Sequence, residues 1–139
     1  MPTLLKAVLA ILGMSILLHL GSAAAQLLVE PKQLLGLGVM VAVVLVESWF
    51  LLGLSKGKDG IRGLVAALYA VGAVAQALMG YAAFDHSMTR YRQPADLPTA
   101  IGAWVGTVLS GFVTYALTRP HVKLWMAEKT MGISEPPGG

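Results

Sequence analysis

The sequence contains no cysteine and few charged residues. Of its 139 residues, 12% are Asp, Glu, Lys or Arg, whereas 56% are hydrophobic. Without cysteine the chain has no disulfides, thiolate metal sites or cysteine nucleophiles. A composition this apolar excludes a water-soluble globular protein. We therefore expect lipid to be the solvent for most of the chain.

The hydrophobic residues cluster in four long runs, which cover residues 4–29, 34–54, 61–84 and 98–117. At about 1.5 Å per residue, each run is long enough to cross a hydrocarbon core of about 30 Å. The runs lack the alternation of barrel strands, and backbone in lipid must satisfy its own hydrogen bonds. We predict an all-α, integral membrane four-helix bundle over residues 1–118. Residues 119–139 are predicted to be an amphipathic juxtamembrane segment with a disordered tail.

The first run also has features of a cleavable secretory signal. Lys6 precedes an apolar stretch, and residues 21–25 are small. Such a signal is removed from the mature protein. The apolar run continues through Val29, which makes it long enough for a membrane span. We expect the span to be retained, with cleavage before Gln26 as the alternative.

The basic residues predict that both termini are cytoplasmic. Positively charged residues are enriched in cytoplasmic segments. This orientation places seven basic residues inside (Lys6, Lys56, Lys58, Arg62, Arg119, Lys123 and Lys129) and three outside (Lys32, Arg90 and Arg92). The Arg119-Pro120 step is typical of a helix start, and Met131-Gly132 of a helix end. We expect a short helix there on the cytoplasmic surface of an inner (plasma) membrane.

Small residues recur every fourth position in the last two runs. Gly72, Gln76 and Gly80 form one stripe, and Gly102, Gly106 and Ser110 form the other. Small residues at this spacing allow two membrane helices to approach closely. The four glycines are therefore predicted helix-packing positions, either within the bundle or in a homodimer.

Glu47 is the one carboxylate embedded in an apolar run. An ionised carboxylate at that depth costs at least about 2 to 3 kcal/mol. No Lys or Arg lies deep in any span. We therefore expect Glu47 to be protonated, solvated by a cavity, or paired with a group from another chain.

Other polar residues are predicted to share two levels of the membrane with Glu47. On the first helix Ser15, His19, Ser22 and Gln26 lie on one face. Helix rise places Ser15, Ser110, Tyr69 and Glu47 roughly 10 to 13 Å from the cytoplasmic boundary, and His19, Gln76 and Thr107 at about 16 to 20 Å. The candidates for proton or cation binding are Glu47, His19, Gln76, Ser15 and Ser110. The alternative is a hydrogen-bonded core without a binding function.

The sequence contains no catalytic motif and no complete set of metal ligands, so we expect neither an enzyme nor a bound metal or cofactor. Its basic residues lie beside apolar spans, and we expect no nucleic-acid partner. Our leading hypothesis is an accessory or scaffolding subunit of a membrane complex, or a homo-oligomer. The expected partners are the bilayer and a membrane protein or a second copy. The alternative is a proton-coupled transporter or channel for small solutes that uses Glu47.

Overall fold

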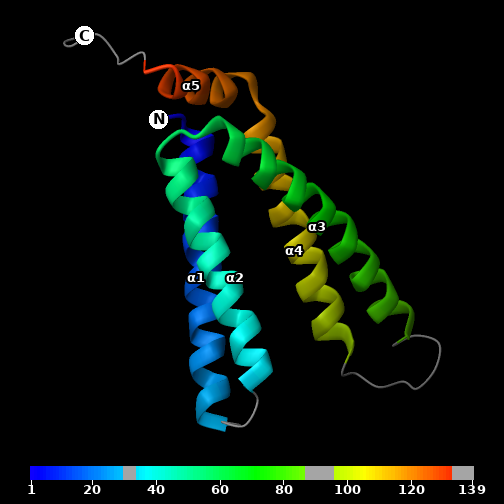
Figure 1. The fold of residues 1–139 in the computed structure, drawn as a ribbon. Helices are drawn as coiled ribbons and strands as arrows, with labels where there is room; N and C mark the ends of the chain where they lie inside the picture. Colours follow the sequence, from blue (N-terminus) through cyan, green and yellow to red (C-terminus); the bar gives the residue numbers. More distant parts are fainter. Residues whose placement is uncertain (30–33, 87–95, 133–139) are drawn as a thin grey trace. The chain divides into compact units, whose positions relative to one another are not determined.

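The computed structural model describes residues 1–29, 34–86 and 96–132, and this part of the chain is helical throughout except for short turns. The helices are α1 (Thr3–Val29), α2 (Leu34–Ser55), α3 (Asp59–His86), α4 (Asp96–Thr118) and α5 (Pro120–Thr130) (Figure 1). The first four are long and apolar enough to cross a membrane. This confirms the all-α prediction and the four helices that are able to span a membrane. The single bundle and its orientation remain predictions.

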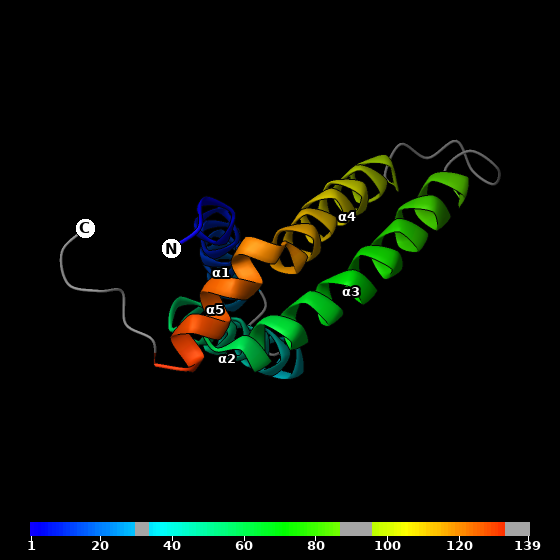
Figure 2. The same cartoon turned by 90° about the horizontal axis from the view of Figure 1, so that it is seen from above.

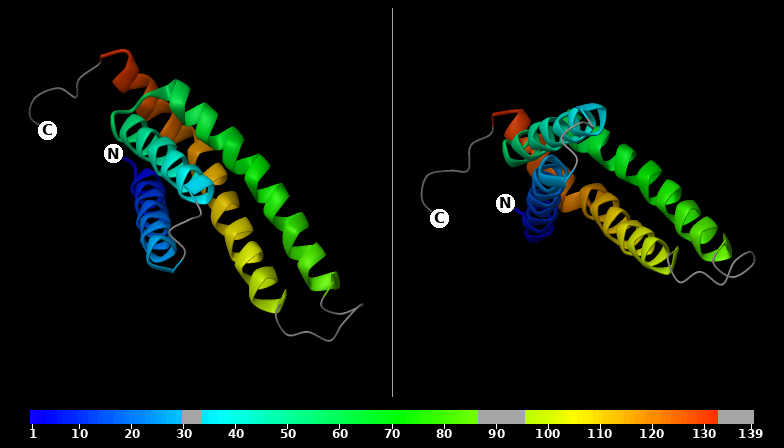
Figure 3. Two further views of the ribbon diagram at one scale, coloured as in Figure 1. Left: turned by 60° about the horizontal axis from the view of Figure 1, so that its bottom comes forward. Right: turned by 90° about the horizontal axis from the view of Figure 1, so that it is seen from below.

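The chain forms two compact units, one made of residues 1–62 and 120–139 and the other of residues 63–119. In the first unit α1 and α2 pack side by side and run in opposite directions (Figures 1 and 3). Leu5, Val8 and Leu12 of α1 are fully buried, and so is Leu54 of α2. The buried positions of α1 are spaced by three and four residues, which places them on one helix face.

A glycine turn ends α2. The amide of Gly57 donates to the carbonyl of Leu54, and the amide of Lys58 donates to that of Gly53. These bonds and a φ of 72° at Gly57 make a Schellman motif, which needs a left-handed residue after the helix. The motif brings the chain directly into α3, whose first turn carries Asp59.

Helix α5 belongs to the first unit and packs against this turn. Its Val122 and Met126 are fully buried, and the Thr130 hydroxyl lies 3.2 Å from the Gly57 carbonyl oxygen as a donor. The helix begins at Pro120, and Gly132 follows it with a φ of 68°. Both ends were predicted. Its place on a cytoplasmic surface remains a prediction, and the predicted disordered tail lies outside the described residues.

In the second unit α3 and α4 lie side by side and antiparallel (Figures 1 and 2). The Trp104 ring packs beside Phe84, with 5.6 Å between the ring centroids. Apolar side chains on the outside of the pair remain uncovered: Val71 is 69% exposed and Val108 is 72% exposed. Surfaces of this kind match hydrocarbon rather than water.

Candidate functional site

Glu47 lies on the buried face of α2. Phe50 and Leu54, three and seven residues further along, are buried on the same face. The Glu47 side chain is only 13% exposed. Apart from Ser48, its near neighbours in α2 are apolar. Burial of the face that carries Phe50 and Leu54 directs the carboxylate toward α1.

Helix α1 supplies the partners of this carboxylate. Its buried face runs through Leu5, Val8 and Leu12, and the same alternation of three and four residues reaches Ser15 and His19 next. The contact face of α1 therefore changes from apolar to polar at Ser15. This change occurs where Glu47 of α2 meets α1.

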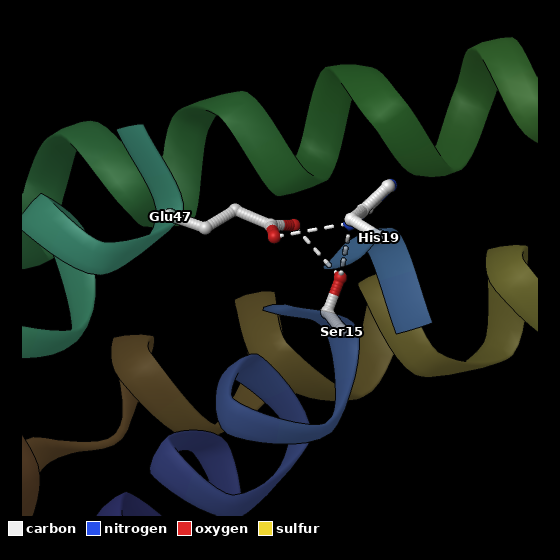
Figure 4. A network of polar contacts seen from close by, with 3 residues as sticks. All are labelled: Ser15, His19 and Glu47. Atoms are coloured by element: carbon white, nitrogen blue, oxygen red, sulfur yellow. Dashed lines mark hydrogen bonds and ion pairs between the residues drawn. The ribbon is translucent and has the colours of Figure 1, made fainter. Parts of the chain in front are cut away.

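Three side chains form a closed polar cluster (Figure 4). The Ser15 hydroxyl donates to Oε1 of Glu47 over 2.7 Å. Nδ1 of His19 lies 3.1 Å from Oε2 of the same carboxylate, and 3.4 Å from Oγ of Ser15. Both carboxylate oxygens thus have a partner from α1, and the His19 ring, with its side chain 38% exposed, reaches the edge of the helix pair.

The hydrogen bond between His19 and Glu47 contains one proton, whose position depends on the tautomer of His19. An unprotonated imidazole nitrogen and a carboxylate oxygen are both acceptors, so a hydrogen bond between them needs one proton on either Nδ1 or Oε2. The Ser15 hydroxyl proton is already directed at Oε1. With its proton on Nδ1, neutral imidazole donates to an ionised carboxylate. One further proton, on either His19 or Glu47, would make the cluster neutral in a setting where charge is costly.

The sequence placed Ser15 at the level of Glu47, but depth alone did not indicate that His19 contacts the same carboxylate, because helix rise put His19 at a deeper level. Side chains in a helix tilt toward the N-terminus of that helix. Because α1 and α2 are antiparallel, His19 and Glu47 tilt toward one another, which closes the offset between their backbone levels. In the sequence, this pairing was indicated by the spacing of three and four residues, which continues the buried face of each helix to these two residues.

The remaining polar candidates belong to the second unit. The Ser110 hydroxyl donates to Oε1 of Gln76 over 3.1 Å, and Ser110 is buried. Thr107 bonds within its own helix, to the carbonyl of Ala103. The Ser110–Gln76 pair contains no acid or base, and it joins α3 to α4. The predicted level shared by Glu47 and Ser110 connects different units and remains a prediction.

Two of the four predicted packing glycines lie in the contact between α3 and α4. A Cβ atom on Gly80 would come within 2.5 Å of the Trp104 ring, and one on Gly106 within 2.9 Å of the Gln76 amide. Gly72 and Gly102 would meet no atom within 4 Å in the part of the chain described. The reason is geometric. A row of every fourth residue runs at about 26° to the helix axis, so it departs from the contact line between two helices, and only part of each row lies in the contact.

The cluster has too few ligands for a metal site of its own. Glu47 and His19 supply one carboxylate and one imidazole, whereas catalytic zinc sites use three protein ligands. Across residues 1–29, 34–86 and 96–132, no group of three or more potential ligands occurs. The chemistry that the cluster can perform with its own groups is proton transfer.

Comparison of the chain with protein-family models, curated proteins and solved structures gave no match. The geometry of Ser15, His19 and Glu47 is therefore the basis on which a function is proposed.

Proposed function

We propose that Ser15, His19 and Glu47 form a proton-binding site and that the protein is a proton-coupled transporter or channel for small solutes. The observation that carries this proposal is the 3.1 Å contact between His19 Nδ1 and Glu47 Oε2 inside an apolar helix pair. Ionisable residues in membrane spans are costly and commonly mark ion or proton pathways. Apolar side chains of similar size would hold α1 against α2 without that cost.

The cluster changes its net charge by one when it gains or loses a proton. A carboxylate beside a neutral imidazole has a charge of −1, and the charge is zero after one proton binds to either group. In the charged state a monovalent cation can take the place of the proton and restore neutrality. Exchange of this kind is what proton-coupled transport requires of a binding site.

The test is proton flux through purified protein in liposomes that contain a pH-sensitive dye. We expect Glu47→Gln to abolish the flux, because the amide has nearly the same shape but cannot release a proton at neutral pH. His19→Gln should reduce the flux strongly. The matched control is Ser110→Ala, which removes a buried hydroxyl that bonds Gln76 rather than the cluster, and which should leave the flux unchanged. Equal flux in wild type and Glu47→Gln would refute the proposal.

A second candidate function is that of an accessory subunit or homo-oligomer, and the two open glycines favour it. Gly72 and Gly102 leave space at the helix surface, and small residues of this kind admit a helix from another chain. For this function Gly102→Leu should release a partner or a second copy from the complex purified in mild detergent. Glu47→Gln should leave that complex intact, which separates the two functions.

A further inference from the structure

Helix α5 brings a third lysine to the turn between α2 and α3. A Cβ atom on Gly57 would lie 2.8 Å from Cβ of Lys129, so only glycine allows this close approach. The Thr130 hydroxyl bonds the Gly57 carbonyl and fixes the end of α5 there. The Thr130 hydrogen bond and the close approach at Gly57 thus hold Lys129 beside the turn.

The turn itself carries two more lysines. Lys56 and Lys58 flank Gly57, with Cα atoms about 3.8 Å from that of the glycine, and Lys56, Lys58 and Lys129 are all exposed. Among the described residues no carboxylate lies within ion-pair distance of these three, and the adjacent Asp59 is bonded to Arg62. Three lysines therefore lie around one turn, and none of them forms an ion pair with a carboxylate of the described residues.

An apolar surface continues from this cluster along α2. Leu52 lies one turn before Lys56 on the same helix face and is 56% exposed, and Trp49 lies almost one turn further and is 53% exposed. On the α5 side the ammonium of Lys129 lies 5.9 Å from the centre of the Trp125 ring. The arrangement has cations at the end of a membrane-spanning helix, an aromatic ring beside them, and exposed hydrocarbon below.

We propose that Lys56, Lys58 and Lys129 bind the phosphate group of an anionic phospholipid whose acyl chains lie along Leu52 and Trp49. Basic clusters directly beside membrane helices attract anionic headgroups. Lysine ammonium groups bind phosphate as point charges without a fixed geometry, which suits exposed and flexible side chains. The apolar face of α2 is what selects a lipid over free phosphate.

The experiment measures binding of phosphatidylglycerol to the purified full-length chain in neutral detergent by native mass spectrometry, with phosphatidylcholine as the uncharged comparison. We expect wild type to prefer phosphatidylglycerol, and Lys56→Gln/Lys58→Gln to weaken its binding by at least about tenfold. The charge-matched control Lys6→Gln/Lys123→Gln removes two basic residues from elsewhere in the unit and should change binding by less than a factor of about two. Lys56→Arg/Lys58→Arg keeps the charge and should retain binding.

Three results would overturn the proposal. Equal losses in the two glutamine double variants would mean that total charge, not this cluster, attracts the lipid. Equal affinity of wild type for the two lipids would show that the lysines do not select the anionic headgroup. Displacement of phosphatidylglycerol by inorganic phosphate at similar concentration would identify a phosphate site without a lipid component. If Lys56→Gln/Lys58→Gln unfolds, Lys129→Gln provides the same test from α5.

Discussion

Nδ1 of His19 in α1 lies 3.1 Å from Oε2 of Glu47 in α2, across 28 residues of sequence. The contact gives an intramembrane carboxylate a basic partner within its own chain, and Ser15 satisfies the other carboxylate oxygen. Ser15 and His19 accommodate Glu47 in an apolar helix pair, and His19 also offers a second position for a bound proton. Structural and functional consequences of the contact are therefore separately measurable.

The structural consequence is an energetic coupling between His19 and Glu47. In a double-mutant cycle with His19→Ala and Glu47→Ala, we expect a coupling of about 0.6 to 1.7 kcal/mol, as for other hydrogen bonds between membrane helices. The measurement is unfolding of each variant in the same detergent. Additive effects of the two substitutions would show that the contact does not stabilise the α1–α2 pair.

The four long helices were predictable because membrane backbone has few options. Every amide in a span must be bonded within a helix, so the apolar runs determined the helices, and their ends differ by no more than two residues from α1 to α4. Arg119-Pro120 and Met131-Gly132 likewise marked α5, because proline favours a helix start and glycine accommodates a positive φ.

The contact of His19 with Glu47 could not be predicted from depth alone. Helix rise gives the level of a Cα atom, but the reactive atoms of Glu and His lie several bonds away and tilt in opposite directions in antiparallel helices. A similar limit applies to glycine stripes. The sequence shows that Gly102 and Gly106 share a row. Of these two glycines, only Gly106 lies in the contact of α4 with α3.

The packing role of Gly106 can be tested against another glycine of α4. Gly106→Leu should lower the free energy of unfolding by about 1 to 3 kcal/mol, because the new side chain displaces the Gln76 amide. Gly111→Leu is the matched control, since a Cβ atom there meets nothing within 4 Å. Thermal unfolding in detergent compares the two, and equal stability would contradict a contact at Gly106.

Gly57 is expected to tolerate no side chain. Gly57→Ala places a Cβ atom at a φ of 72°, which costs about 1 to 2 kcal/mol, and pushes against Lys129. Gly60→Ala, at an open position in α3, should be neutral or slightly stabilising. Unfolding of both variants in one detergent gives the comparison. A stable Gly57→Ala would contradict the close approach of α5 to the turn.

The predicted orientation is testable by thiol labelling, since the chain has no native cysteine. With both termini cytoplasmic, Lys58→Cys should react with a membrane-impermeant reagent only from the cytoplasmic side, and Leu97→Cys only from the opposite side. The reverse pattern would invert the topology. Labelling of both positions from the same side would show that the segment between them does not cross the membrane once, as α3 is predicted to do.

The most direct test of the central claim is infrared spectroscopy of the carboxyl group of Glu47 in reconstituted protein. Difference spectra between wild type and Glu47→Gln, recorded in H₂O and in D₂O over a series of pH values, isolate the bands of this carboxyl group. We predict a protonated-carboxyl band that grows on acidification, shifts in D₂O, and is absent from Glu47→Gln. A carboxylate that stays ionised at every pH at which the protein remains folded would contradict the account.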